Sequence, residues 1–382
     1  MKSKRTKGTP HPRNESQGGG RVAKGPTSKP IRFAVVGAGH IAQNAVIPAF
    51  ANTAKDCVLT TLFSDDEKKR RALSRKYKID HALGYDAFDE ACRSGTFDAV
   101  YIALPNHLHR DYTVRAANAG IHVLCEKPMA VTSDECHEML DAAAKNNIRL
   151  MIAYRLHFEQ ANMKAVEIVQ SGKLGDPRFF NSVFSMQVRS GNVRTQADKG
   201  GGPLFDIGIY CINAARYLFR AEPIEISASA IRGDDPRFAE IDEAVSVTMK
   251  FPGSRIASFV CSFGASDVSH YQVVGTKGDL VANPAFDYRH VLEHKVTING
   301  KARTTVFKKR DQFAAELVYF AQCIRDGTDP APGGREGLID VMIIEEIERS
   351  IRKGKAITMP RLPVEPRPDL LQELRFAPSK SK

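Results

Sequence analysis

The apolar run at residues 123–125 ends abruptly in a carboxylate, an ammonium group and a proline, which are Glu126, Lys127 and Pro128. This pattern is typical of a buried strand that reaches its carboxyl end, where open parallel sheets bind their ligands. A lysine at such an edge, beside a glutamate and an apolar wall, can have its charge tuned for chemistry. The motif alone also fits a surface ion pair followed by a turn. Lys127 is therefore a candidate catalytic residue whose role depends on its neighbours.

A second candidate pair follows the glycine-rich stretch at residues 200–202. Asp206 and Tyr210 lie four residues apart in a segment that predicts a helix, so their side chains would share one face. A carboxylate and a phenol placed together can orient a polar substrate and exchange a proton with it. The same spacing also occurs when an exposed aspartate and a core tyrosine have no joint task. These residues alone leave both interpretations open.

The elements that must position these groups begin with Ile31–Val36, whose continuous apolar character predicts a strand buried on both faces. It leads into residues 37–42 (GAGHIA) and then into a predicted helix. A strand, a glycine turn and a helix are the context in which the GxGxxG/A pattern indicates dinucleotide binding. Gly37 permits the tight turn, Gly39 lets a pyrophosphate approach the main chain, and Ala42 replaces the third glycine. The alternative is an ordinary tight turn.

The next predicted strand, Cys57–Phe63, ends at Ser64 and is followed by three acidic residues that begin with Asp65. A carboxylate at this strand end would bind the 2′-hydroxyl of NAD, whereas a small polar residue with nearby cations would accept the 2′-phosphate of NADP. Ser64 and the basic side chains of the next helix, Lys69 among them, favour NADP. Asp65 keeps NAD possible. The acidic residues also suit the first turn of a capped, solvated helix.

Buried strands and helices alternate strictly through the first 154 residues, which predicts a doubly wound parallel sheet. After about residue 154, strand-like stretches follow one another with short turns, which predicts an open, mostly antiparallel sheet partly covered by helices. In the first half, a further unit is expected to begin near His81, and strands are expected at residues 97–104, 121–125 and 149–153. In the second half, strands are expected at residues 179–188, 225–232, 244–251, 255–263, 270–275 and 296–298, and closing helices at 312–325 and 335–353.

The length of 382 residues exceeds what one hydrophobic core usually holds, so two domains are expected. No apolar run approaches the roughly 20 residues of a membrane-spanning helix. The net charge of +11 resembles that of a nucleic-acid-binding protein, but residues 1–30 carry eight basic side chains against one carboxylate. The remainder is only mildly basic, so we expect no nucleic-acid partner and no membrane partner.

The seven cysteines are scattered, odd in number and form no CxxC pair, which favours reduced thiols in a cytoplasmic protein over a disulfide framework. No apolar segment follows the basic N-terminus, so a secretory signal is not expected. Residues 1–29 are rich in Gly, Pro, Ser and Lys, which predicts a disordered tail. His107 and His109 have no local cysteine or carboxylate partner, and we expect no metal site.

The segments VVGAGHIA, ALPNHLH, HVLCEKPMA and GGPLFDIGIY, in this order and spacing, resemble the Gfo/Idh/MocA oxidoreductases, and among them most closely glucose–fructose oxidoreductase and related aldose dehydrogenases. The resemblance runs from about Lys29 to about Thr358. It implies an N-terminal Rossmann domain at residues 30–154 and a C-terminal α+β domain at residues 155–360, with a short tail at 361–382. It also implies a homodimer or homotetramer formed through the C-terminal sheet.

The resemblance assigns roles to individual residues. Lys127 would be the active-site lysine, Asp206 the substrate-orienting aspartate, and Tyr210 the proton-transfer residue, where many relatives have histidine. Ser64 and Lys69 match the positions that bind the 2′-phosphate, although Asp65 departs from the neutral residue usual there. The expected cofactor contacts are Gly37, Gly39, His40, Ile41, Ser64, Lys69, Leu104, Pro105, Asn106, His109, Glu126, Lys127 and Arg155.

The implied activity is the NADP-dependent oxidation of an aldose at C1 to the lactone, with a tightly held cofactor that a second sugar could reoxidise. Removing the C1 hydroxyl proton requires a base, and a tyrosine is a poor base near neutral pH unless a cation favours its phenolate. Lys127 would supply that cation. Alternatives are the dehydrogenation of an inositol, a dihydrodiol or a nucleotide-linked sugar, or a cofactor-sensing protein without turnover.

Overall fold

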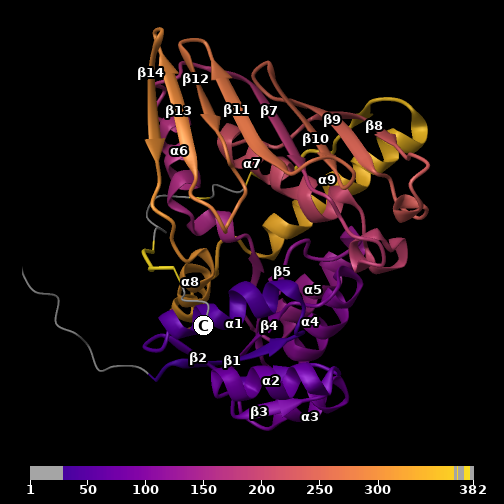
Figure 1. Cartoon of the computed structure of the whole chain (residues 1–382), viewed down its shortest axis with the longest axis vertical. Helices are drawn as coiled ribbons and strands as arrows, with labels where there is room; N and C mark the ends of the chain where they lie inside the picture. The colour runs from indigo at the N-terminus through magenta and orange to yellow at the C-terminus, as the bar shows by residue number, and fades with distance from the viewer. Residues whose placement is uncertain (1–28, 365–367, 369–373, 379–382) are drawn as a thin grey trace, which may run out of the picture.

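The chain forms two β-sheets that are stacked end to end in an elongated molecule (Figure 1). A computed structural model describes residues 29–364, 368 and 374–378. The predicted N-terminal and C-terminal tails lie largely outside these residues. Among the helices that the structure describes, none has the length and apolar character to cross a membrane.

The first sheet has six parallel strands in the order β3-β2-β1-β4-β5-β6, which confirms the predicted doubly wound fold. Reversal of strand order on either side of β1 creates the crevice at which such sheets bind nucleotides. Two buried clusters cover its faces, one built with α3, α4 and α5 and the other with α1, α2 and α8. The strands are β1 Ile31–Val36, β2 Cys57–Phe63, β3 His81–Leu83, β4 Ala99–Ile102, β5 His122–Glu126 and β6 Leu150–Ala153. The helices of this half are α1 Ile47–Ala49, α2 Glu67–Tyr77, α3 Phe88–Arg93, α4 His109–Asn118 and α5 Ser133–Lys145.

The helix predicted after the glycine turn is irregular. It consists of a π-helical segment, Ala42–Val46, the short α1 and a 3₁₀ turn, Phe50–Asn52. Pro48 explains the interruption, because proline lacks the N–H of a regular helix and its ring crowds the carbonyl one turn earlier.

The second sheet has nine strands in the order β14-β13-β12-β11-β7-β10-β9-β8-β15. Every neighbouring pair is antiparallel except β7 with β10, which confirms the mostly antiparallel prediction. The sequence did not predict β12, β14 or β15. The strands are β7 Pro177–Ser185, β8 Glu225–Ile231, β9 Ala244–Phe251, β10 Arg255–Ser262, β11 Val268–Gly275, β12 Gly278–Ala282, β13 Glu293–Ile298, β14 Lys301–Val306 and β15 Ile357–Thr358.

Three helices lie against one face of the second sheet: α6 Gln160–Gln170, α7 Ile209–Phe219 and α9 Gly334–Lys353 (Figure 1). The opposite face carries apolar side chains in the open, where Phe179, Ile256 and Val260 are 40–46% exposed. Neighbouring positions on this face carry serine, threonine and asparagine. A sheet face of this mixed, half-apolar kind is typical of a surface that another protein covers.

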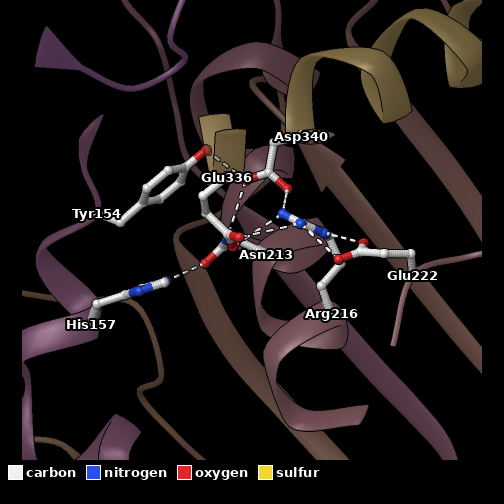
Figure 2. Close-up of polar contacts among 7 residues, drawn as sticks. All are labelled: Tyr154, His157, Asn213, Arg216, Glu222, Glu336 and Asp340. Atoms are coloured by element: carbon white, nitrogen blue, oxygen red, sulfur yellow. Dashed lines mark hydrogen bonds and ion pairs between the residues drawn. The ribbon is translucent and has the colours of Figure 1, made fainter. Parts of the chain in front are cut away.

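A buried polar cluster joins the end of β6 to helices α7 and α9 (Figure 2). Arg216 bonds to three carboxylates, those of Glu222, Glu336 and Asp340, at 2.5–3.3 Å. Asp340 also accepts the Tyr154 hydroxyl at 2.6 Å. The Asn213 amide group donates to Glu336 and Asp340, and its oxygen lies 2.8 Å from a His157 ring nitrogen. The cluster therefore fixes α7 against the carboxyl end of the first sheet.

Helix α8, Gln312–Asp326, returns to the first sheet and packs against it through Phe313, Leu317 and Phe320. The proposed domain boundary at residue 155 stays a prediction. The described residues 374–378 lie beside α8, where the Phe376 carbonyl accepts the Asp311 amide. All seven cysteines are buried.

Candidate active site

The glycine turn after β1 is shaped for the close approach of a ligand. Gly37 has a φ of +106°, and a Cβ atom there would lie 2.6 Å from the Ala103 carbonyl oxygen, so a larger residue cannot replace it. A Cβ atom on Gly39 would meet only that same oxygen, at 3.9 Å. Gly39 and His40 are exposed and Ile41 is half-buried at the start of the helical segment. This open main chain fits a pyrophosphate.

The loop after β4 forms the opposite wall of the crevice. Leu104 is buried, whereas Pro105 and Asn106 are half-buried. The Asn106 amide donates to the Gly200 carbonyl at 2.7 Å, which links this wall to the glycine-rich loop of the second half. The expected cofactor contacts of this loop therefore lie beside the segment that leads to Asp206.

His109 lies at the start of α4, and its contact with a cofactor stays a prediction. The ring is fully buried, and its two nitrogens lie 2.8 Å from the Pro128 carbonyl and 2.9 Å from the Leu104 carbonyl. Burial lowers the pKa of His109, although its two main-chain hydrogen bonds oppose the shift. Its place indicates a support that ties the loop after β4 to the loop containing Lys127.

Lys127 lies at the carboxyl end of β5, as predicted, and points toward the second half of the chain. Its Nζ donates to the Asp206 carbonyl at 2.7 Å and lies 3.4 Å from the Asp206 carboxylate. The same nitrogen lies 4.7 Å from the centre of the Tyr210 ring. Burial lowers the pKa of Lys127, but Tyr210, Asp206 and Glu126 outweigh burial, so the pKa stays above its ordinary value. The ammonium group is therefore charged at neutral pH.

Asp206 and Tyr210 share one face, as predicted, but not of a regular α-helix. Residues Leu204–Gly208 form a π-helical turn that continues into α7. The wider turn still brings residues four apart together. Burial raises the pKa of Asp206, but Arg194 and Lys127 outweigh it and lower the pKa to about 2. No hydrogen bond to the Tyr210 hydroxyl occurs among the described residues, so this group is available to a ligand.

Arg155 completes the wall behind Tyr210. Its guanidinium group lies 5.0 Å from the Tyr210 ring centre and 5.3 Å from that of Tyr288. It donates to the Gln312 side chain at 2.7 Å and to the Phe286 carbonyl, and it is 6% exposed. The structure brings Arg155 into the predicted group, and its contact with a cofactor stays a prediction.

Two carboxyl groups, those of the half-buried Glu126 and of Glu316, lie near each other at the end of β5. Glu126 accepts the Tyr101 hydroxyl at 2.8 Å. Burial raises the pKa of Glu126, while Lys127, Tyr101 and Arg155 oppose the shift. Glu316 of α8 is fully buried, and neither oxygen has a hydrogen-bond partner among the described residues. Burial and the nearby Glu126 raise the pKa of Glu316 well above its ordinary value, and Arg155 opposes this. The sequence analysis missed Glu316 because only tertiary contacts place it here.

Arg194 is a second residue that the sequence analysis missed. Its Nε donates to the Asp206 carboxylate at 2.6 Å, opposite the oxygen that faces Lys127. It comes from an irregular loop that carries no local motif, so only the folded chain reveals it. Burial lowers the pKa of His40, and Arg194 and Arg289 lower it further, which places positive charge beside the glycine turn.

The end of β2 carries the residues predicted to meet the ribose of the cofactor, and that contact stays a prediction. Ser64 is 5% exposed, and Arg70 donates to its carbonyl. Lys69 pairs with Asp66 at 3.1 Å, which keeps its ammonium group near the strand end. One carboxylate oxygen of Asp65 accepts the Tyr85 amide at 2.9 Å. The second oxygen of Asp65 accepts no hydrogen bond from the described residues, so Asp65 keeps the alternative of NAD open.

These residues fit a nicotinamide dinucleotide. The glycine cradle faces the loop after β4, cations gather at both ends of the crevice, and Lys127 lies at its second-half wall. Among the residues that the structure describes, no group of three or more His, Cys, Asp or Glu side chains is placed to hold a metal ion.

Comparison with known proteins agrees with this geometry. The family model described as "Oxidoreductase family, NAD-binding Rossmann fold" matches residues 31–154, and the GFO/IDH/MocA C-terminal domain model matches residues 162–281. The chain is similar to D-xylose 1-dehydrogenase [NADP(+)] of Haloarcula marismortui, with 32% identity over 84% of this chain and 91% of the relative. It is also similar to dTDP-3,4-didehydro-2,6-dideoxy-alpha-D-glucose 3-reductase of Saccharopolyspora spinosa, with 27% identity over 85% and 99% of the two chains.

Among solved structures, the crystal structure of aldose-aldose oxidoreductase from Caulobacter crescentus complexed with glycerol matches 86% of this chain and 100% of that chain. The TM-score is 0.82 and the sequence identity is 33%. The resemblance drawn from the sequence is confirmed over both halves. The chain belongs to the GFO/IDH/MocA family of oxidoreductases.

Proposed function

We propose that this enzyme uses NADP to oxidise an aldose at C1, giving the lactone. The observation that carries the proposal is the position of Lys127, whose Nζ contacts Asp206 and lies over the Tyr210 ring at the edge of a dinucleotide-binding crevice. The proposal is supported by the similarity to a xylose dehydrogenase that uses NADP and to an aldose-aldose oxidoreductase. Ser64 and the cations near it support NADP over NAD.

The side chains divide the chemical tasks as follows. A bound NADP⁺ would supply the hydride acceptor for C1. The Tyr210 oxygen receives the C1 hydroxyl proton, and the charge of Lys127 stabilises the negative charge that Tyr210 carries as a base. Asp206, ionised at any working pH because its pKa is lowered to about 2, accepts hydrogen bonds from sugar hydroxyls. Asn106 links the loop after β4 to the glycine-rich loop at residues 200–202, and His109 links the loop after β4 to the loop that contains Lys127.

The test compares wild type with Lys127→Met, using NADP⁺ and a panel of aldoses that includes D-glucose and D-xylose. We expect aldose-dependent reduction of NADP⁺ by wild type and a loss of about 10³-fold or more in kcat/KM for the variant. Lys145→Met, an exposed lysine on α5, is the matched control and should keep full activity. A wild type that oxidises no aldose would reject the sugar assignment, and an active Lys127→Met would remove Lys127 from the mechanism.

We also propose that the cofactor stays bound and is reoxidised by a second sugar, as the name of the Caulobacter crescentus relative suggests. The measurement is the mass and absorbance of any nucleotide that copurifies, followed by the stoichiometry of lactone and sugar alcohol in mixtures of two sugars. Equal amounts of the two products without added NADP⁺ support the proposal. Lactone that forms only with added NADP⁺ contradicts it.

A nucleotide-linked sugar is the second candidate substrate, because the similarity to the dTDP-sugar 3-reductase spans 85% of this chain. Its oxidised or reduced carbon would be C3 rather than C1. A panel that contains free aldoses, inositol, a dihydrodiol and dTDP-sugars separates these possibilities, since the preferred substrate identifies the reacting carbon.

We further propose that a second copy of the chain covers the open face of the nine-stranded sheet. Phe179, Ile256 and Val260 form an apolar patch across the paired strands β7 and β10. Val260→Glu would place a charge in that patch. Light scattering after size exclusion should show a homodimer or homotetramer for wild type and a smaller species for the variant. A monomeric wild type would reject this assembly.

A further inference from the structure

Arg194 presents unused hydrogen-bond donors to the substrate side of the site. Its Nε donates to the Asp206 carboxylate at 2.6 Å. Its two terminal nitrogens make no hydrogen bond to any described residue, and its side chain is 37% exposed. A guanidinium group holds five N–H donors in a fixed plane, so the donors that Asp206 does not use keep a set direction beside it.

The main chain around Arg194 is held rigidly in place. The carbonyls of Arg194 and Gln196 accept the amides of Gly202 and Gly201 at 2.9 and 3.0 Å. A Cβ atom on Gly201 would lie 2.6 Å from both of these carbonyl oxygens, so glycine is required there. The next glycine, Gly200, is bonded by Asn106 from the first half. Arg194 is thus part of the same frame that holds Asn106 and Asp206, and is not a loosely tethered surface residue.

Four side chains follow one another across the site. The Lys127 Nζ lies 4.7 Å from the centre of the Tyr210 ring, and the same nitrogen lies 3.4 Å from one carboxylate oxygen of Asp206. The other carboxylate oxygen of Asp206 accepts a hydrogen bond from Arg194. The hydroxyls of a pyranose also follow one another around the ring. If C1 reacts at Tyr210 and Lys127, the C2 hydroxyl faces the Lys127–Asp206 contact and the next one reaches Arg194.

We propose that Arg194 is a specificity-determining residue that binds the C3 hydroxyl of the aldose. This inference rests on the proposed function. A sugar hydroxyl both donates and accepts, so it can donate to Asp206 and accept from Arg194 at the same time. The paired charges of Arg194 and Asp206 also suit a neutral ligand, because the two side chains compensate each other. The sugar hydroxyl supplies the acceptor that the terminal nitrogens of Arg194 lack.

The experiment uses whichever of D-glucose and D-xylose the wild type oxidises faster, with its 2-deoxy and 3-deoxy analogues. The variants are Arg194→Met and Arg194→Lys, with Arg189→Met as the matched control, since Arg189 is an exposed arginine of the preceding loop. Thermal melting establishes that each variant is folded. Calorimetric titration with 1,5-anhydro-D-glucitol, which lacks the C1 hydroxyl and cannot react, gives a binding constant that is independent of turnover.

In wild type, we expect kcat/KM for the parent sugar to exceed that for the 3-deoxy analogue by about 10- to 100-fold. In Arg194→Met this ratio should fall to about threefold or less, while the 2-deoxy ratio stays within about threefold of its wild-type value. Arg194→Lys should recover part of the discrimination against the 3-deoxy analogue, because lysine restores a charged hydrogen-bond donor but not the planar, two-pronged geometry of the guanidinium group. The affinity for 1,5-anhydro-D-glucitol should fall about 10-fold or more in Arg194→Met, and Arg189→Met should match wild type throughout.

Two results would overturn the inference while leaving the proposed function intact. The first is an active wild type whose 3-deoxy ratio is unchanged in Arg194→Met. The second is loss of the 2-deoxy ratio instead, which would place the C2 hydroxyl at Arg194. A wild type that oxidises no aldose would reject the proposed function, and this inference with it.

Discussion

Replacement of Arg216 by methionine tests whether the buried cluster holds the site together. Arg216 is 3% exposed and bonds to Glu222, Glu336 and Asp340 (Figure 2). Removing one partner of a buried ion pair costs about 3–5 kcal/mol, because the remaining charge is left without compensation. We therefore expect Arg216→Met to lower the free energy of unfolding by about 3–5 kcal/mol at pH 8. The loss should be smaller at pH 5, where the carboxyl groups can take up protons.

The cluster also has a defined dependence on pH. Burial raises the pKa of Glu336 to about 7; Arg216 opposes the shift, while Asp340 and Glu222 add to it. Because this pKa lies above the ordinary value of 4.5, the folded state holds the proton more tightly than the unfolded state. The stabilisation is complete below the ordinary value and is lost as the pH rises to about 7. Acidification from pH 8 to pH 5 should thus stabilise the chain by about 1–3 kcal/mol through this group.

Glu336→Gln and Asp340→Asn form a matched pair for locating the proton. Glutamine can keep its carbonyl oxygen at the bonds from Asn213 and Arg216, at 2.8 and 3.1 Å, and place its amide nitrogen where the other Glu336 oxygen lies 3.3 Å from Arg216. Glu336→Gln should therefore be about 1–3 kcal/mol more stable than wild type at pH 8 and should lose the acid stabilisation. Asp340 accepts short hydrogen bonds from Tyr154 and Arg216, both at 2.6 Å. An amide there turns a donor toward other donors, so Asp340→Asn should be destabilised at both pH values by about 2–4 kcal/mol.

The assay is guanidinium-induced unfolding at 25 °C, followed by circular dichroism at pH 5, 6.5 and 8, with thermal melting as a second measure. The reasoning is refuted if Glu336→Gln is no more stable than wild type at pH 8 and keeps the wild-type pH dependence. The proton would then not lie on Glu336. An Arg216→Met variant as stable as wild type at pH 8 would show that the cluster does not brace α7 against the first sheet.

Three further outcomes are expected at the site. Ser64→Asp should shift the NADP/NAD ratio of kcat/KM toward NAD by about 10- to 100-fold, because a carboxylate repels the 2′-phosphate and accepts the 2′-hydroxyl; an unchanged ratio contradicts the assignment. Asp206→Asn should lower kcat/KM by about 10²-fold or more. This factor should be the same at every pH from 5 to 9, because the lowered pKa keeps Asp206 ionised across that range. A loss of activity seen only at the acidic end or only at the basic end would contradict this expectation. His109→Leu should lower kcat about 10²-fold with little change in cofactor affinity, because the His109 ring contacts the Pro128 carbonyl in the Lys127 loop; loss of cofactor binding alone would instead support the predicted contact of His109 with the cofactor.

The first sheet followed closely from the sequence because its strands are buried on both faces and read as continuous apolar runs. The sequence placed β1 and β2 within the observed bounds, and β4, β5 and β6 within a few residues. In the second half, β14 is exposed along its whole length, so its sequence lacks the alternation of apolar and polar residues that predicts a half-buried strand. The strand β12 is short and follows a turn closely. Such elements depend on pairing with neighbours, which local pattern does not reveal.

The residues of the site fall into the same two groups, those that the sequence predicted and those that only the folded chain reveals. Lys127, Asp206 and Tyr210 carried a motif or a spacing, and the structure brings them into contact. Arg194 comes from an irregular loop, and Glu316 lies on a helix about 190 residues after Glu126 in the sequence. Only the packing of the two halves places them at the site. His109 lies next to a cofactor motif in the sequence, and only the folded chain shows that its ring is buried between two main-chain carbonyls.

A single turnover with an aldose deuterated at C1 tests the central claim most directly. The sugar is mixed with excess enzyme and NADP⁺, and the nucleotide and sugar products are separated and analysed by mass spectrometry and NMR. The account predicts that the deuterium appears at C4 of the nicotinamide and that the sugar product is the lactone. Deuterium that stays on C1 of the sugar while NADPH forms would show that another carbon is oxidised and would contradict the account.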